Sequence, residues 1–566
     1  MKRRLFALML ALAMLCPMVL AGCNSGDSKD TDNSSVQETT TRETVSINMW
    51  VVTDEKTTAE AQAAVEEAFN TITKSTYTTY VDLIFVTADE YAETLNAKFQ
   101  QADELKAQGG SKKPAAATTE TDGETTEALE TNEYGVTVLK YPEISEGQID
   151  IVFINGMEQL VELVEQGRLQ NLNTHISETG AAKVLTDVIP SELLTYSKIN
   201  SGTYGIPNNR VVGEYTYLLV NKDIVTGDAN GDGTVSGDEI SGTYCNIDDI
   251  STFFDCENLI EYIKTNRSDL VPVLEEFNNP YIHYWSEDGE FSILASKKSF
   301  VSQASDFNPE YGLKNVFSID EFTEFELLMK KYETGSYFAK DVEATKQAQN
   351  FGVAVMTGDS AIVDEYSENY YVKVISNPTL NNDNLFTSFY GITNYCGNVD
   401  RALEIITMLN TDSELRNVLQ YGVEGVHYEL DENDRVERFN NDYIMNLEDT
   451  GNVFIAYPEE GMDDDVWERG VKTNLDIKID PLTGLWSVWS QVDSTIISNL
   501  AKQSKAFKDR MDACKTVDEL TAFFETAKTE AAMDAAFVAA TNSENTASYK
   551  AVYSSWYTKN WPATDA

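Results

Sequence analysis

The sequence IDIVFINGMEQLVELVEQGRLQNLN, residues 149–173, contains the pattern that decides the fold of this chain. Within it, Ile151–Ile154 form an apolar run, Asn155-Gly156 supplies a turn, and Met157–Gln166 carries apolar residues at helical spacing before a glycine. A short apolar run predicts a buried strand, and a glycine after a helical pattern indicates a helix C-terminus. The stretch therefore predicts one strand–turn–helix unit.

Two similar units precede it. Ser46–Val52 is a strand candidate, and the residues after it place apolar side chains at i, i+4 and i+7. Tyr80–Val86 repeats this arrangement, with a second apolar stripe after it. Successive strand–helix units predict a parallel, doubly wound sheet. The residues of the two stripes are Val65, Phe69, Ile72, Tyr91, Leu95 and Phe99.

Further elements are expected along the chain. Tyr215–Val220 and residues 370–376 read as strands, and residues 400–420 as two helices separated by a capping box at Thr411–Glu414. The chain from about Trp486 onward reads as mostly helical. Residues 109–132 lack large apolar side chains and are expected to form a mobile surface insert.

The N-terminus predicts export. A cationic start is followed by an apolar stretch within residues 1–22, which is typical of a secretory signal peptide. The residues Leu-Ala-Gly-Cys that end in Cys23 resemble the lipobox of bacterial lipoproteins, which implies a lipid anchor on Cys23 and a location on the extracellular face of the membrane. Residues 23–44 are polar and are expected to form a disordered tether.

Charge and cysteine content narrow the classes of partner. The formal charge of −51 would repel nucleic acid and leaves neutral or cationic ligands. The low cysteine count does not suggest a disulfide scaffold, and a Cys245–Cys256 bridge and two separate thiols are both left open.

Four segments together resemble the family 1 extracellular solute-binding proteins, the sugar-binding lipoproteins of ABC importers. They are SINMW at 46–50, the opening stretch at 149–173, GTYGIPNNRVVGEYTYLLVNKDIV at 202–225, and the segment at 390–440 that begins YGITNYCGNVD. The resemblance covers residues 45 to about 440, and it implies a carbohydrate ligand, an oligosaccharide by preference, that is delivered unchanged to an ABC permease by a monomeric binding protein.

The resemblance also implies the architecture: an α/β, two-lobe, periplasmic-binding-protein-like (type II) fold with hinge strands between the lobes. The expected N-terminal lobe comprises residues 45–215 and 388–435. The expected C-terminal lobe comprises residues 216–387 and 436–566, with an insert at 226–243. In such folds the ligand lies beyond the carboxyl ends of the strands.

Candidate ligand-binding residues follow from that expectation, because sugars need polar groups for their hydroxyls and aromatic faces for their rings. The polar candidates come just after predicted strands or near the first hinge crossing. An alternative assigns Asp54 to a helix N-cap, Asn208 and Asn209 to a turn, and any tryptophan to packing. The candidates are Asp54, Asn155, Gly156, Asn208, Asn209, Arg210, Glu214, Trp285, Trp486 and Trp489.

Residues 228–239 match a calcium-binding EF-hand loop. Oxygen ligands occupy positions 1, 3, 5 and 9, a glycine stands at position 6, and a glutamate at position 12. The loop predicts a structural Ca²⁺ site with no catalytic role. Its candidate ligands are Asp228, Asn230, Asp232, Thr234 (through its main-chain oxygen), Ser236 and Glu239.

Enzymatic function is not expected. The three histidines lie far apart in the sequence, and no HExxH, GxSxG or Walker motif is present. A secreted, lipid-anchored glycoside hydrolase is the alternative, because the many acidic residues leave room for a catalytic carboxylate pair. A calcium-dependent adhesion or scaffold protein is a third reading, suggested by the EF-hand-like loop alone.

Overall fold

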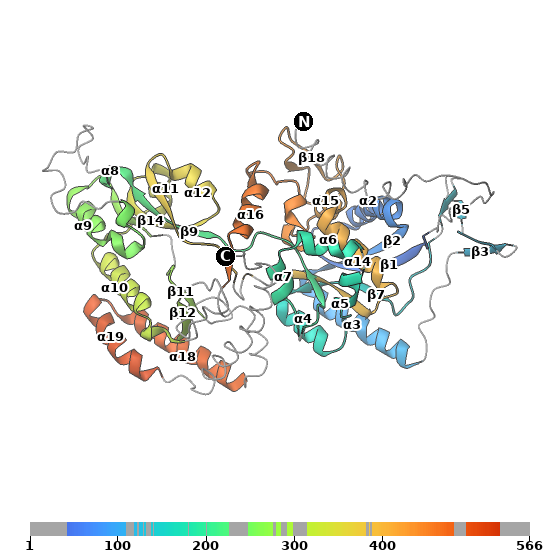
Figure 1. Cartoon of the computed structure of the whole chain (residues 1–566), viewed down its shortest axis with the longest axis horizontal. Coiled ribbons are helices and arrows are strands. Elements are labelled where there is room, and N and C mark those ends of the chain that lie inside the picture. Colours follow the sequence, from blue (N-terminus) through green and yellow to red (C-terminus); the bar gives the residue numbers. More distant parts are fainter. Residues whose placement is uncertain are drawn as a thin grey trace, which may run out of the picture. The chain divides into compact units, whose positions relative to one another are not determined.

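A five-stranded sheet in the order β2-β1-β7-β17-β8 is built from two separate stretches of the chain (Figure 1). Strand β1 runs parallel to β2 and β7, whereas β17 runs antiparallel to both β7 and β8. We call this sheet the first sheet. Its strands are β1 (Val45–Thr53), β2 (Thr79–Thr87), β7 (Ile149–Asn155), β8 (Gly205–Pro207) and β17 (Ser388–Tyr395).

The computed structural model describes most of the chain after residue 41. The described residues are 42–108, 141–178, 180–199, 201–225, 247–275, 279–284, 291–297, 314–380, 384, 388–479 and 494–531, with short strands inside 118–139.

Helices surround the first sheet, so both faces of its central strands are buried. Strands β1 and β7 are buried along nearly their whole length, and their buried polar residues Asn48 and Asp150 are hydrogen-bonded to each other. The helices are α2 (Ala59–Tyr77), α3 (Ala88–Ala107), α4 (Gly156–Glu165), α5 (Asn173–Glu178), α6 (Gly180–Val188), α7 (Ser191–Tyr196), α14 (Val399–Thr411) and α15 (Ser413–Tyr421).

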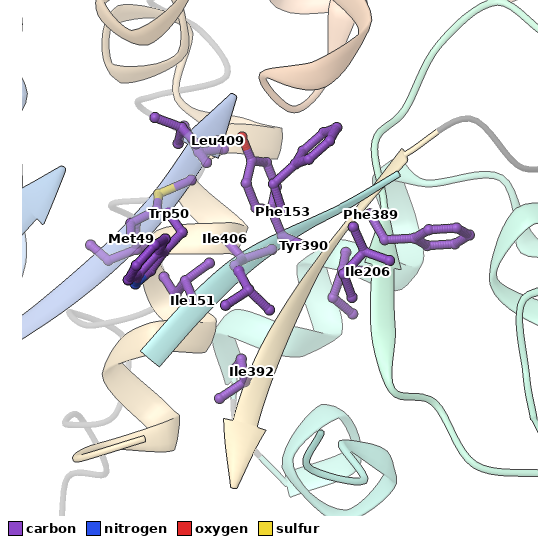
Figure 2. Close-up of a cluster of buried hydrophobic side chains, with 14 of the residues drawn as sticks. Met49, Trp50, Ile151, Phe153, Ile206, Phe389, Tyr390, Ile392, Ile406 and Leu409 are labelled. Atoms are coloured by element: carbon purple, nitrogen blue, oxygen red, sulfur yellow. The ribbon is translucent and has the colours of Figure 1, made fainter. Parts of the chain in front are cut away.

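The core of this part forms where side chains of β1, β7 and β17 meet those of α14 (Figure 2). Phe153 and Tyr390 pack edge to face with ring centroids 6.1 Å apart. Trp50 is 4% exposed, so it is a core residue.

A four-stranded sheet in the order β10-β14-β9-β15 forms the second sheet. Strand β9 runs antiparallel to β14 and β15, and β10 runs parallel to β14. The strands are β9 (Tyr215–Asn221), β10 (Val271–Leu274), β14 (Phe351–Gly358) and β15 (Tyr370–Ser376). The accompanying helices are α8 (Lys222–Val225), α9 (Glu257–Asn266), α10 (Asp320–Thr334), α11 (Val342–Ala348) and α12 (Ala361–Tyr366).

A third, aromatic cluster joins the C-terminal helices to α10. Phe317 contacts the rings of Phe507 and Phe523, with centroids 5.2 and 5.5 Å apart. The helices α18 (Ser494–Ala513) and α19 (Val517–Glu530) confirm the predicted helical character for the described residues 494–531. The small sheet beside them comprises β11 (Ile282–Tyr284), β12 (Leu294–Lys297) and β13 (Lys314–Asn315).

The chain passes between the first and second sheets at β8–β9 and again before β17. Strand β16 (Thr379–Leu380), on the second passage, pairs with β20 (Lys478–Ile479). Gly213 has a φ of +71° and lies against the main chain of Thr379, where a Cβ atom would be 3.1 Å from its nitrogen.

The residues after α15 form a mostly irregular stretch that returns over the first sheet. Its elements are β18 (Tyr428–Leu430), β19 (Val436–Arg438), the 3₁₀ turns η7 (Leu447–Asp449) and η8 (Val453–Ile455), and α16 (Val466–Leu475).

Two local predictions need correction. The first sheet is mixed and not wholly parallel, because the chain leaves it at the end of β8 and re-enters beside that end, so β17 runs the opposite way. Asp412, and not Thr411, caps α15, since its side chain accepts a hydrogen bond from the Leu415 nitrogen.

Inside and just after the insert predicted at residues 109–132, described residues form short hairpins. These are β3 (Thr118–Thr121) with β4 (Glu124–Glu127) and β5 (Leu129–Thr131) with β6 (Thr137–Leu139). The mobility of the insert stays a prediction.

Several predictions fall outside the described residues. Among them are the anchor cysteine Cys23, the calcium loop at 228–239 and Cys245. Residues 44 onward form one compact unit, and the predicted boundaries between two lobes stay a prediction.

Candidate functional site

One edge of the first sheet gathers polar residues from four strands. Thr53 pairs with Thr87, and the register of β1 with β7 places Thr53 level with Asn155. Asn155 in turn pairs with Ser388, and Asn208 follows the β8 residue that pairs with Phe389. We call this row the carboxyl edge, because β1, β2, β7 and β8 all end there.

Asp54 and Asn155 lie on the carboxyl edge, as predicted. Asp54 is partly exposed and its Oδ1 accepts a hydrogen bond from the Lys56 nitrogen at 2.9 Å. It does not cap α2, because Thr58 does so. Asn155 is exposed, and Gly156 starts α4 with a φ of +81°, a conformation that glycine adopts at little cost.

Asn208 forms a buried junction with Ser388. Its Nδ2 donates to the Ser388 hydroxyl at 2.9 Å, and its main-chain nitrogen donates to the Ser388 oxygen at 3.1 Å. The Oδ1 of Asn208 is buried and has no hydrogen-bond partner among the described residues. A buried amide oxygen without a donor is costly, so a ligand hydroxyl or a water molecule is the chemistry that suits it.

Asn209 and Arg210 have structural contacts that hold the hinge crossing. Asn209 donates through Nδ2 to the oxygen of Val188 at 2.8 Å and accepts at its main-chain oxygen from Val453 at 2.9 Å. The guanidinium of Arg210 donates to the main-chain oxygen of Asn384 at 2.5 Å. The simple turn considered for residues 208–209 is therefore wrong, since both side chains are buried in specific hydrogen bonds.

Arg210 lies beside an acidic segment that the sequence analysis missed. Its Nη1 is 3.5 Å from the Oε2 of Glu448, and its side chain is 12% exposed. Burial lowers the pKa of Arg210, and the charge of Glu448 opposes that shift. Glu214, also predicted, is exposed at the start of β9.

The segment from Ile444 to Thr450 lies over the carboxyl edge. The Ser388 hydroxyl donates to the oxygen of Glu448 at 3.2 Å, and the Tyr390 hydroxyl donates to the oxygen of Asp449 at 2.7 Å. Burial raises the pKa of Asp449, while hydrogen bonds from Ser388 and Asn446 work in the opposite direction. No local pattern in residues 444–450 marks them in the sequence, because they reach the site only through the return of the chain after α15.

The predicted aromatic residues Trp285, Trp486 and Trp489 lie outside the described residues. A tryptophan that was not predicted, Trp467 on α16, packs edge to face on Phe454, with ring centroids 6.4 Å apart. Phe454 follows the residue that donates to the Asn209 oxygen, so this partly buried aromatic pair lies near the hinge crossing.

A separate hollow of about 550 Å³ lies between α12 and α16, and none of the predicted site residues lines it. Arg469 spans it, with its Nε 2.8 Å from Asp359 and its Nη2 2.9 Å from Asp463. Its wall holds charged and polar side chains and no aromatic ring, which is unlike a sugar subsite. The lining residues are Ala361, Asp364, Glu365, Asn433, Arg435, Asp463, Asp464, Asp465 and Arg469.

The described part of the chain lacks two kinds of feature, a cluster of metal-binding side chains and a membrane-spanning helix. There, no three His, Cys, Asp or Glu side chains are grouped in a way that could hold a metal ion. No helix in the same part is both long and apolar enough to cross a membrane.

Comparison with known proteins identifies relatives. A carbohydrate ABC transporter substrate-binding protein of Streptococcus pneumoniae is 22% identical over 300 residues, which cover 48% of this chain and 60% of the relative. The match thus spans less than two thirds of that protein. No protein-family model matches the chain.

A solved structure shares the fold. The N-glycan transport solute binding protein NgtS of Streptococcus pneumoniae superposes with a TM-score of 0.52 at 16% identity, covering 90% of this chain and 99% of that one. An HMO-binding, ABC-transporter-associated solute binding protein of Bifidobacterium longum infantis has a lower TM-score of 0.47 at 14% identity, with coverage of 91% and 99%. The resemblance seen in the sequence is confirmed, and the chain has the two-lobe α/β fold of the solute-binding proteins of ABC importers.

Proposed function

We propose that this chain is an extracellular substrate-binding protein of an ABC importer that captures a carbohydrate and delivers it to the membrane permease. The observation that carries the proposal is the carboxyl edge of the first sheet, where Asn155, Asn208 and Ser388 lie side by side under residues 444–450. Amide, hydroxyl and carboxylate groups of this kind suit sugar hydroxyls. The curated relative is itself named as a carbohydrate-binding component.

Within the proposal the ligand leaves chemically unchanged, and an oligosaccharide is the preferred class. The aromatic pair of Trp467 and Phe454 near the hinge crossing supports a sugar, because pyranose rings stack on aromatic faces. The protein is proposed to act as a monomer, held outside the cell by lipid on Cys23, with a structural Ca²⁺ ion in the loop at 228–239.

The test follows thermal stability and chemical product together. The purified chain is incubated with a panel of neutral oligosaccharides, and melting temperature and reducing-end release are measured on the same samples. A binding protein is stabilised by mass action and releases no product. Reproducible hydrolysis would favour the glycoside hydrolase, and no stabilisation by any oligosaccharide would contradict the proposal.

A further inference from the structure

Residues at the end of the first sheet and on α15 donate hydrogen bonds to main-chain oxygens of residues 444–450. The oxygen of Ile444 accepts from the Asp54 nitrogen at 3.2 Å and from the Thr53 hydroxyl at 3.1 Å. Two buried side chains of α15 continue the series: Gln420 donates to Met445 at 2.9 Å and Arg416 donates to Leu447 at 2.7 Å.

The series ends with the two contacts to β17 already described, from Ser388 to Glu448 and from Tyr390 to Asp449. Five carbonyl groups of one short irregular segment are therefore occupied by groups beneath it. A segment fixed in this way loses little conformational entropy when a ligand binds, so its surface is preorganised.

The segment carries two neighbouring carboxyl groups at the carboxyl edge, one half-exposed and one more deeply buried. The side chain of Glu448 is 43% exposed, and Asp449 follows it in the same 3₁₀ turn. Asn446 uses its Oδ1 to accept from the Glu448 nitrogen at 3.1 Å. Carboxylate oxygens accept hydrogen bonds from sugar hydroxyl groups, and they repel another anion.

The nearby cations offset only part of this charge. Arg210 already donates to the main chain of Asn384 and Val211 and pairs with Glu448, so its guanidinium is committed. Two further cations lie near the carboxyl edge: Arg416, which is buried beneath Leu447, and Lys56, which is exposed to solvent in the turn after β1. Asp54 and Glu55 lie in that same turn, so carboxyl groups outnumber cations at this edge.

We propose that residues 444–450 form a fixed recognition surface that accepts uncharged sugar residues and rejects sugars bearing a carboxylate, with Glu448 and Asp449 as the residues that set this specificity. The inference rests on the proposed function, and it narrows the ligand to neutral glycans. Like-charge contact in a partly buried site is costly, and at least a tenfold preference for the neutral form is expected.

The test uses one pool of glycans in two charge states. N-linked glycans are released from a serum glycoprotein, half of the pool is treated with sialidase, and the two halves are mixed in equal amounts. The purified chain is incubated with the mixture, and the bound glycans are identified by mass spectrometry. The neutral forms should be enriched at least about tenfold over the sialylated forms.

Variants test whether charge or size causes the preference for neutral glycans. Glu448→Gln, and Glu448→Gln combined with Asp449→Asn, should each reduce the preference, whereas Glu429→Gln at an exposed site on β18 should leave it unchanged. High salt should also weaken the preference, since it screens partly exposed charges. A preference that survives both changes would be steric and would overturn the inference.

Two other outcomes of the glycan experiment distinguish a failure of the inference from a failure of the proposed function. Equal capture of the two forms, or better capture of the sialylated form, overturns the inference and leaves the proposed function standing. Capture of no glycan at all contradicts the proposed function, and the inference fails with it.

Discussion

The side chain of Asn208 and the hydroxyl of Ser388 are joined by a 2.9 Å hydrogen bond across 180 residues of sequence. A parallel main-chain contact of 3.1 Å between the same two residues closes the end of β8 onto the start of β17. This junction fixes the orientation of the Asn208 amide, and its Oδ1 is then left buried without a partner among the described residues.

Removing this amide should weaken ligand binding. Asn208→Ala is expected to lower the affinity for the best oligosaccharide of the panel about tenfold, which corresponds to one hydrogen bond of about 1.4 kcal/mol. Isothermal titration measures the change. Asn173→Ala is the control, because the Asn173 amide is hydrogen-bonded at both ends within the fold and lies away from the carboxyl edge. Equal loss of affinity in both variants would argue against a ligand contact for Asn208.

Gln420 should prove necessary for the shape of residues 444–450. In Gln420→Met the Met445 oxygen and the Thr450 hydroxyl, which contacts the Gln420 Oε1 at 2.5 Å, both lose a buried partner. The expected cost is about 2–4 kcal/mol of unfolding free energy, with weaker ligand binding as well. Urea unfolding followed by circular dichroism measures the cost. Gln166→Met, at an exposed position where the side chain contacts Glu162, should change the free energy little.

Gly451 should tolerate no side chain. It has a φ of +107°, and a Cβ atom there would lie 2.3 Å from the main-chain oxygen of Leu409. Gly451→Ala is expected to cost about 3 kcal/mol or more, because backbone strain and overlap add. Gly461 has a φ of +88° with nothing within 4 Å, so Gly461→Ala isolates the backbone cost, about 1 kcal/mol. Equal melting temperatures for the two variants would contradict the packing argument.

Glu326 should make stability depend on pH. Burial raises the pKa of this α10 carboxyl to about 7, while Lys508 and Lys330 pull it down and Asp512 pushes it up. A carboxyl whose folded pKa lies above its ordinary value near 4.5 stabilises the fold in the protonated form. That stability is fully present below pH 4.5 and is lost as the pH rises through 7.

The difference between the ordinary pKa near 4.5 and the folded pKa of about 7 corresponds to about 3 kcal/mol of unfolding free energy. Glu326→Gln should therefore flatten the fall in melting temperature between pH 5 and pH 8, and Glu324→Gln, exposed on the same helix, should not. The same slope in both variants would mean that another group is responsible.

The proposed calcium site can be tested by removing the metal. Adding Ca²⁺ at a hundred times its dissociation constant should raise the unfolding free energy by about 2.7 kcal/mol, and a chelator should reverse the change. Glu239→Gln should abolish the response, since position 12 supplies two ligand oxygens in such loops. Glu429→Gln, outside the loop, should retain it. A melting temperature that does not respond to Ca²⁺ in the unaltered chain would remove the site from the proposal.

The sequence predicted the parts of the fold that depend on local pattern. The strands that end at Thr53 and Asn155 and the helix stripes around Val65 and Tyr91 are buried as expected, because their periodicity alone decides which face is apolar. The antiparallel course of β17 was missed, since it depends on where the returning chain re-enters the sheet.

The candidate site also contains residues that the sequence predicts and residues that depend on how distant parts of the chain pack. Asn155 could be predicted because it follows a strand that the pattern identifies, and Asn208 because the family resemblance implies a hinge crossing there. Glu448 and Asp449 could not, because nothing near them in the sequence indicates that Tyr390 and Arg416 would hold their segment over the sheet. Their position is a consequence of packing between residues far apart in the chain.

The place of β17 between β7 and β8 has a consequence for folding during synthesis. The strand that completes the first sheet is made last, so a polypeptide that has not yet reached residue 395 exposes backbone groups of β7 and β8 that β17 later pairs. Such a nascent chain cannot complete the sheet, or bring Ser388 to Asn208, until 395 of its 566 residues have been made.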